Sequence, residues 1–193
     1  MSATLSADLQ ALADALDAAE RDARSIVAGL TEAQGAWRAN PGSWSVAECI
    51  DHLATANRVY LAAMSPPAAQ ARRDHRERRR PARPGLVGGW FVNYLEPPVK
   101  PSLRGKAPRK IRPRTAPPLS DAMAMFLASQ DKVRSFLRTY ADVDLAGVRF
   151  PNPFIRGVRF SLATGLHVIA AHERRHLWQA RRVREAAERS SSR

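Results

Sequence analysis

The chain has 193 residues, 45% of them hydrophobic, and a formal net charge of +13; this length suffices for the core of one domain, which we expect to span residues 1–193. It holds no run of eighteen apolar residues and no start like that of a signal peptide, so we predict a cytoplasmic protein that makes no contact with a membrane. Cys49 is the only cysteine, which excludes an intrachain disulfide and a thiolate zinc cluster and leaves nitrogen and oxygen as metal ligands.

The first predicted element is an amphipathic helix. Apolar residues recur at alternating steps of four and three residues, a spacing that places them on one narrow face suited to packing against other helices. They are Leu5, Leu9, Leu12, Leu16, Ala19, Ala23, Ile26 and Leu30. We expect Thr31 and Gly35 to end this helix and Asn40-Pro41-Gly42 to form a turn.

A second helix is predicted to begin at Ser45-Val46-Ala47-Glu48. A serine followed three residues later by a glutamate is a capping box, in which each side chain accepts a hydrogen bond from a backbone amide of the first turn. The apolar spacing extends this helix to about Met64. We expect Pro66-Pro67 to close it, because proline lacks the amide hydrogen that a helix interior requires.

The next segment, residues 65–118, is predicted to be a long crossover. It holds fourteen Arg or Lys, three acidic residues and eleven of the fourteen prolines, so nearly all the excess charge lies in an extended connection. We therefore do not expect nucleic acid as a partner, although the net charge alone would suggest one. Trp90, Phe91, Tyr94 and Leu95 are apolar enough to form a short helix over the domain, whereas residues 100–118 are too rich in Pro and Arg for a helix interior.

Two further helices complete the predicted fold. Ser120 is expected to cap the third helix, and the fourth should run from Leu162 to Ala187, with a frayed polar tail over residues 185–193. Strand-like patterns are confined to the short runs 148–150 and 158–160. Four amphipathic helices with a long crossover between the second and the third indicate an all-α fold, a four-helix bundle.

The fourth helix carries the most informative motif of the chain, His172-Glu173-Arg174-Arg175-His176. Two imidazoles four residues apart stand one above the other on one helix face, where both can reach one divalent metal. The alternative is that both histidines are hydrogen-bonded residues of the core or the surface. His167 falls on the opposite side of the helix and should face solvent.

The same five residues match the His-Glu-x-x-His motif of zinc proteases, in which the glutamate acts as general base. The surrounding sequence argues against a protease. Arg182 stands where the extended motif places a third histidine, and no predicted edge strand is available to align a peptide. A third ligand from upstream fits better, since His52 lies in another predicted helix, and three imidazoles would leave a coordination position open for water or substrate. Zn²⁺, Ni²⁺ and Fe²⁺ all suit such a site.

Two segments of the chain together resemble the DinB-like superfamily. The segment Trp44 to Leu53, WSVAECIDHL, resembles its second-helix motif, and His172 to Gln179, HERRHLWQ, resembles its fourth-helix motif, His-x-x-x-His-x-x-Gln. The resemblance implies a bundle with up-down-down-up order and a divalent metal, nickel or zinc, held by His52, His172 and His176. It also implies a homodimer, and some relatives transfer low-molecular-weight thiols or isomerise a small molecule with a thiol cofactor.

The resulting hypothesis is a metal-dependent enzyme that acts on a small-molecule substrate by thiol transfer or hydrolysis. Glu173 is the candidate catalytic residue, with the alternative that it only orients a ligand or pairs with an arginine. Trp44, Asn57 and Gln179 are candidates for lining the pocket or supporting the ligands. The competing hypothesis is a non-catalytic helical module that binds a metal or forms a dimer.

Overall fold

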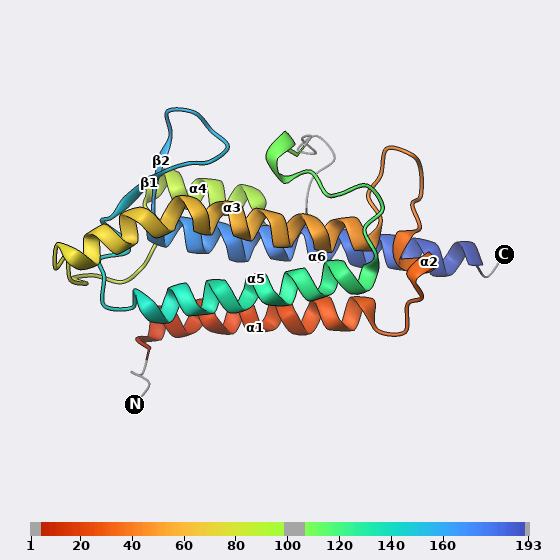
Figure 1. The fold of residues 1–193 in the computed structure, drawn as a ribbon, viewed down its shortest axis with the longest axis horizontal. Helices are drawn as coiled ribbons and strands as arrows, with labels where there is room; N and C mark the ends of the chain where they lie inside the picture. The colour runs from red at the N-terminus through yellow and green to blue at the C-terminus, as the bar shows by residue number, and fades with distance from the viewer. Residues whose placement is uncertain (1–4, 99–106, 192–193) are drawn as a thin grey trace.

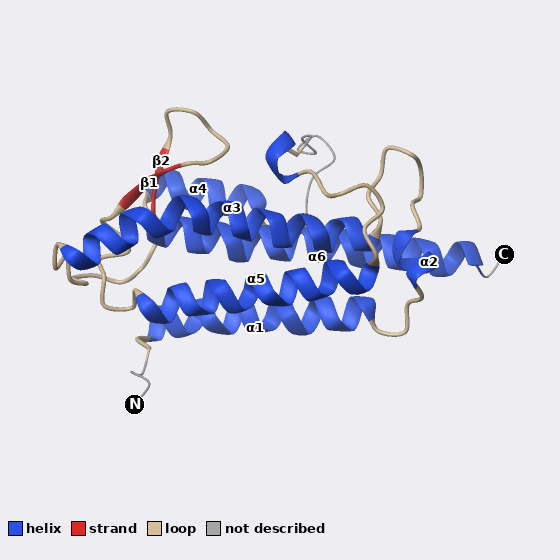
Figure 2. Ribbon diagram, viewed as in Figure 1, coloured by secondary structure: helices blue, strands red, loops and turns tan. Residues whose placement is uncertain are grey.

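The computed structural model describes residues 5–98 and 107–191, and it confirms the predicted all-α class (Figures 1 and 2). Four long helices carry the fold: α1 (Ala7–Val27), α3 (Val46–Arg73), α5 (Leu119–Thr139) and α6 (Leu162–Ser191). Shorter elements connect them: α2 (Glu32–Ala36), α4 (Leu86–Leu95), the 3-10 turn η2 (Arg109–Ile111), and the strands β1 (Arg149–Pro151) and β2 (Arg159–Ser161).

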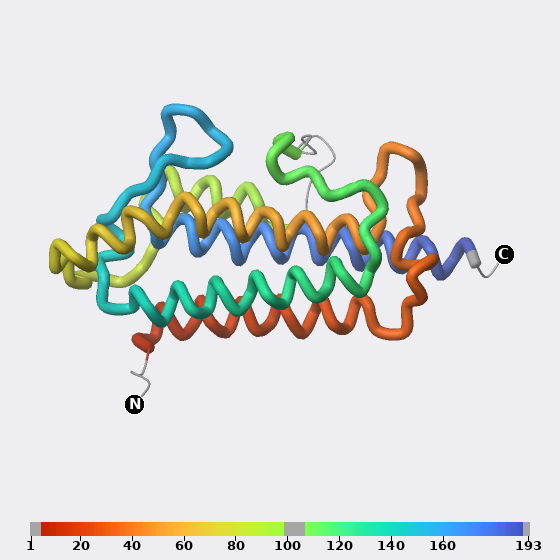
Figure 3. The backbone as a smooth tube through the Cα atoms, viewed as in Figure 1, coloured from red at the N-terminus to blue at the C-terminus, as the bar shows by residue number. Residues whose placement is uncertain are grey.

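The four long helices lie side by side, with α1 and α6 running in one direction and α3 and α5 in the other (Figures 1 and 3). α3 packs against both α5 and α6, and α1 closes the arrangement against the same two helices. The apolar faces meet in a core whose largest fully buried side chains include Leu9, Leu53, Phe126, Ile169 and Leu177. Six of the eight apolar residues whose spacing predicts the first helix are buried in α1: Leu9, Leu12, Leu16, Ala19, Ala23 and Ile26.

The end of α1 differs from the expectation. α1 stops at Val27, and Thr31 does not end it but begins the short helix α2, with a capping box in which Thr31 and Gln34 bond each other's backbone amides. Threonine is common both in turns and just before a helix, so its presence alone does not separate an end from a beginning. The predicted capping box at Ser45 is confirmed: Ser45 Oγ accepts from the Glu48 amide at 3.2 Å, and Glu48 accepts from the Ser45 amide at 2.9 Å.

The prediction that Pro66-Pro67 closes the second helix was wrong. α3 continues through both prolines to Arg73, so the crossover begins near residue 74 and not at residue 65. Beyond the prolines, Ala68 and Ala71 are buried in the same core as Met64. This burial offsets the two helix hydrogen bonds, to the carbonyls of Ala62 and Ala63, that the prolines cannot donate.

The crossover folds back over the helices. The predicted short helix is confirmed as α4, which packs against α6 through a face that includes Gly88, Val92 and Leu95. Part of the Pro/Arg-rich segment expected to lack helix, residues 99–106, lies outside the described residues, and the part that follows contains only the single turn η2.

The last two long helices also depart in detail from prediction. Ser120 does not cap α5; instead Glu32 of α2 accepts hydrogen bonds from the amides of Leu119 and Ser120, so the cap comes from a distant segment. The tail expected to fray from residue 185 is helical to Ser191.

The two strand-like runs pair as an antiparallel ribbon, with Phe150 opposite Phe160. None of the helices in the described ranges combines the length and the apolar character that crossing a membrane requires.

Asp8 in the first turn of α1 anchors the start of the crossover. Its carboxylate accepts hydrogen bonds from the Arg78 guanidinium at 2.5 and 2.6 Å and from the Ala82 amide at 2.6 Å. Burial raises the pKa of the Asp8 carboxyl, but these hydrogen bonds outweigh burial and lower the pKa from 3.8 to about 2. The ionised form therefore stabilises the folded state at neutral pH.

We predict that Asp8→Asn lowers the free energy of unfolding by about 2 kcal/mol at pH 7. The pKa of Asp8 is lower in the folded state than in the unfolded state. The difference in stability between the variant and the wild type should therefore have its full size above pH 4 and shrink as the pH falls toward 2. Urea unfolding followed by circular dichroism at several pH values measures it. Asp14→Asn, at an exposed position of the same helix, is the matched control; equal effects of the two substitutions would contradict the anchoring role.

Candidate metal centre

Three histidines meet where α3 packs against α6. His52 comes from the second turn of α3, and His172 and His176 come from one face of α6. One ring nitrogen of each lies within 4.8 Å of one ring nitrogen of each of the others. His52 is buried and His172 is partly exposed, so the cluster lies at the edge of the helical core.

The backbone of the crossover fixes the orientation of His52. Its Nδ1 lies 2.5 Å from the Ile111 carbonyl oxygen, and because a carbonyl can only accept, Nδ1 carries the proton and donates. The other nitrogen, Nε2, is then unprotonated and lies 3.2 Å from Nε2 of His172. A hydrogen bond of this kind on the far nitrogen is what holds a metal-binding imidazole in place.

Gln179 has the same role for His176. Its Oε1 lies 3.0 Å from His176 Nδ1, one turn further along α6, which leaves Nε2 of His176 free. Trp44 covers the cluster, with its ring 4.7 Å from that of His52 and 5.6 Å from that of His176, measured between centroids. Both residues were candidates for supporting the site, and both are in direct contact with the histidines.

The surroundings keep the three imidazoles neutral. Burial lowers the pKa of His52 from 6.5 to about 4, against the opposing effect of the bond to Ile111. Burial and the proximity of His52 hold the pKa of His172 well below its ordinary value, and burial and the proximity of His172 do the same for His176. Neutral imidazole is the form that ligates metals.

These residues fit a divalent metal. Two nitrogens that each lie about 2.1 Å from one ion are separated by about 3.0–3.4 Å in octahedral or tetrahedral geometry. The separation of 3.2 Å between Nε2 of His52 and Nε2 of His172 falls in this range. Nε2 of His52 is an acceptor at this distance, and either the Nε2–H of a neutral His172 or an ion between the two nitrogens can satisfy it. The cluster could therefore hold a metal through three nitrogen ligands.

Glu173 points away from this cluster into the core. Adjacent helix positions differ by about 100° in direction, and the Glu173 carboxylate accepts hydrogen bonds from Asn57 Nδ2 at 2.8 Å and Gln130 Nε2 at 3.1 Å. Asn57 also donates to Ser129 Oγ at 3.1 Å. Asn57, predicted to line the pocket or support the ligands, is thus the partner of Glu173.

Glu173 is fully buried, and burial raises the pKa of its carboxyl from 4.5 to about 7 despite the hydrogen bonds from Asn57 and Gln130. Within the part of the chain that the structure describes, Gln130 Oε1 is buried without a hydrogen-bond partner. A half-turn of the Gln130 amide would bring Oε1 toward Glu173, where it can accept the proton of a neutral carboxyl.

The expectation that His167 faces solvent was wrong. His167 is half-buried, and its Nε2 lies 3.0 Å from the carbonyl oxygen of Ala82, in the crossover. His167 does lie on the side of α6 opposite the histidine pair, but the crossover folds back over that side and covers it. His167 takes no part in the three-histidine cluster.

Sequence reasoning missed the contributions of the crossover to the site. Ile111 offers only a backbone carbonyl, which no residue pattern identifies. Three residues later in the crossover, Arg114 binds Asp51 through both its backbone amide (2.9 Å) and its guanidinium (2.7 Å). Asp51 precedes His52, so the crossover is bound to α3 directly beside this candidate metal ligand. The pairing of a basic residue with Asp51 could have been suspected, but its position could not.

The fold and the site together define an all-helical protein with a three-histidine cluster between two antiparallel helices. A sequence profile of the DinB superfamily matches residues 15–180, and the chain belongs to this superfamily. The matched range includes His52, His172 and His176, and it confirms the family predicted from the two motifs. No curated protein and no solved structure matches the chain significantly.

The raised pKa of Glu173 leads to a prediction about stability. The folded state binds the proton of the Glu173 carboxyl more tightly than the unfolded state does. The stabilisation that this proton gives the folded state is therefore full below pH 4.5 and is lost as the pH rises to about 7. The loss amounts to about 3 kcal/mol. Glutamine cannot ionise. Between pH 5 and pH 8 the free energy of unfolding of Glu173→Gln should therefore rise by about this much relative to that of the wild type.

Urea unfolding of both proteins in the presence of a chelator measures this difference. The histidines titrate in both proteins, so their contribution cancels in the comparison. Parallel pH profiles of the two proteins would show that Glu173 keeps its ordinary affinity for a proton in the folded state.

Proposed function

We propose that this protein is a metal-dependent enzyme that acts on a small molecule by thiol transfer or hydrolysis at His52, His172 and His176. The observation that carries the proposal is the convergence of three neutral imidazoles, two of which have their Nδ1 atoms engaged by Ile111 and Gln179. Buried imidazoles need hydrogen-bond partners in any core, so what favours a metal site is that ring nitrogens of all three histidines lie within 4.8 Å of one another. His172 is partly exposed, and we propose that a ligand reaches the cluster from this side.

Nickel and zinc are the metals we propose, because the three ligands are imidazole nitrogens and both ions favour them. An ion held there would supply a Lewis acid, which lowers the pKa of a thiol or of water. A low-molecular-weight thiol is the co-substrate that we propose for the transfer reaction. Three protein ligands would leave room for it, as catalytic sites require.

The protein residues have separate tasks in this proposal. Ile111 and Gln179 hold two ligands in the tautomer that leaves Nε2 free, and Trp44 supplies an apolar wall beside them. Glu173 remains the candidate for moving a proton, but its hydrogen bonds to Asn57 and Gln130 favour the alternative, in which it supports α6 from within the core. Loss of turnover without loss of metal in Glu173→Gln would favour proton transfer.

A second candidate is a non-catalytic module that binds a metal and associates with a second copy of the chain. The observation in its favour lies on α4, where Leu86, Val87 and Trp90 are 97%, 73% and 68% exposed. Clustered exposed apolar side chains are typical of association surfaces. The enzyme proposal is compatible with such a homodimer, so the two candidates differ in turnover and not in oligomeric state.

The first test is metal content, measured by elemental mass spectrometry after loading with Ni²⁺ or Zn²⁺ and dialysis. We expect close to one ion per chain in the wild type and very little in the triple variant His52→Ala/His172→Ala/His176→Ala, because all three ligands are gone. His167→Gln, on the same helix but outside the cluster, is the control and should load fully. Circular dichroism establishes that each variant is folded.

Loaded protein is then assayed for consumption of a thiol in the presence of an electrophilic small molecule, and for ester hydrolysis. Turnover that the triple variant lacks and His167→Gln retains supports the enzyme. Full metal loading without turnover supports the second candidate, and equal metal in the wild type and the triple variant overturns the site.

Sedimentation equilibrium tests the homodimer. We expect Leu86→Ser/Trp90→Ser to weaken self-association roughly tenfold or more, because two large apolar side chains would lose burial. Ile155→Ser removes an exposed apolar side chain from the loop between β1 and β2 and serves as the control. A wild-type protein that is monomeric across the accessible concentrations would refute the proposed dimer.

A further inference from the structure

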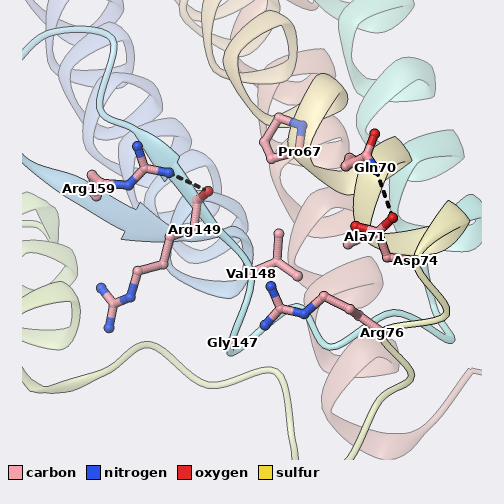
Figure 4. Close-up of a pocket in the computed structure, with 9 residues that line it drawn as sticks. All are labelled: Pro67, Gln70, Ala71, Asp74, Arg76, Gly147, Val148, Arg149 and Arg159. Carbon is pink, nitrogen blue, oxygen red and sulfur yellow. Dashed lines mark hydrogen bonds between the residues drawn. The ribbon is translucent and has the colours of Figure 1, made fainter.

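A cleft lies at the end of α3 away from the histidines (Figure 4). Its volume is about 400 Å³, and it lies between the last turns of α3, the segment that follows α3, and the β1–β2 ribbon. Pro67, in its wall, follows His52 by fifteen residues of helix, which corresponds to about 22 Å along α3. This cleft is therefore separate from the candidate metal centre.

Three arginines line this cleft, Arg76, Arg149 and Arg159, and hydrogen bonds hold the backbone at each of them. Arg149 and Arg159 lie on the same exposed face of the ribbon, and the Arg159 guanidinium donates to the Arg149 carbonyl at 3.1 Å. Arg76 follows a tight turn after α3; its amide donates to the Ala71 carbonyl and its carbonyl accepts from the Asp144 amide, both at 2.9 Å. Figure 4 shows Arg76 reaching from that turn toward the ribbon.

The charges of these arginines are not neutralised within the described residues. Arg76, Arg149 and Arg159 have no carboxylate within ion-pair distance there, unlike Arg78 and Arg134, which bind carboxylates at 2.5–2.8 Å. Asp74 is the one acidic residue that lines the cleft, and its carboxylate accepts from Gln70 at 2.7 Å. The lining thus has three positive charges and one negative charge.

The floor of the cleft is apolar. Pro67, Ala71 and Val148 line it, and the side chains of Ala71 and Val148 are almost fully buried beneath the surface. A ligand that fits both features carries a compact anionic group for the guanidinium groups and a small apolar part for the floor. Planar guanidinium groups match phosphate oxygens through paired hydrogen bonds, and a dianion balances the lining better than a single carboxylate.

We propose that this cleft binds the phosphate group of a small organic phosphate monoester, with Arg76, Arg149 and Arg159 as its ligands. The phosphate lies between the ribbon and the turn after α3, and the organic part rests on Pro67. Asp74 opposes the anion and limits its affinity. Phosphate binding here needs neither the metal nor the histidines. It can therefore be tested independently of the proposed enzyme activity.

Calorimetric titration of the full chain with inorganic phosphate and with phenyl phosphate tests the proposal. We expect saturable binding of both, with phenyl phosphate tighter because its ring covers the apolar floor. Arg149→Gln/Arg159→Gln should weaken both roughly tenfold or more, since two charge-assisted contacts are lost. Asp74→Asn should tighten both, because the opposing charge is gone.

The matched control is Arg21→Gln/Arg58→Gln, which removes the same net charge from exposed positions of α1 and α3 outside the cleft. Binding within about twofold of the wild type in this control, with the loss confined to the cleft variant, supports a specific site. Equal weakening in both variants, or a lack of saturable binding in the wild type, overturns it. The triple histidine variant should bind phosphate as the wild type does; loss of binding there would assign the phosphate to the metal centre instead.

Discussion

The close packing of α3 against α6 is the constraint on which the site depends. His52 and His172 are 120 residues apart in the chain, and only the register between these two helices brings their Nε2 atoms to 3.2 Å. Gly165 permits this approach further along the same contact: a Cβ there would lie 2.7 Å from Met64 Sδ and 2.9 Å from the Phe150 ring. The contact that holds the helices therefore also sets the spacing of the ligands.

The polar group inside the core shows why neighbouring residues of α6 have different tasks. His172 and His176 face His52 at the edge of the contact between α3 and α6, whereas Glu173 points into the core, where Asn57 of α3 and Gln130 of α5 bind its carboxylate. Burying an acid is costly unless its partners are supplied, and here amides from two helices supply them. The chain thus matches the zinc-protease motif in its residue types but not in their arrangement, because the Glu173 carboxylate is turned into the core and not toward the histidines.

The sequence predicted those features that local chemistry determines. The helices follow apolar spacing, the Ser45 capping box follows two side chains three residues apart, and the His172–His176 pair follows helix geometry. Prediction failed where distant segments decide. Core burial carries α3 past Pro66-Pro67, Glu32 supplies the cap that Ser120 was expected to form, and the Ala82 carbonyl covers His167. In each case the deciding partner lies too far along the chain for a local pattern to identify.

The basic crossover has a structural purpose that its composition conceals. Asp8 binds its first part through Arg78 and Ala82, and Asp51 binds its last part through Arg114. Between these anchors, α4 packs on α6, and the Ile111 carbonyl meets His52. Two basic residues of this segment, Arg78 and Arg114, therefore fasten it to acidic residues of the long helices. The ring of His52 is oriented by a segment that belongs to no long helix, so the candidate centre depends on the crossover as directly as on α3 and α6.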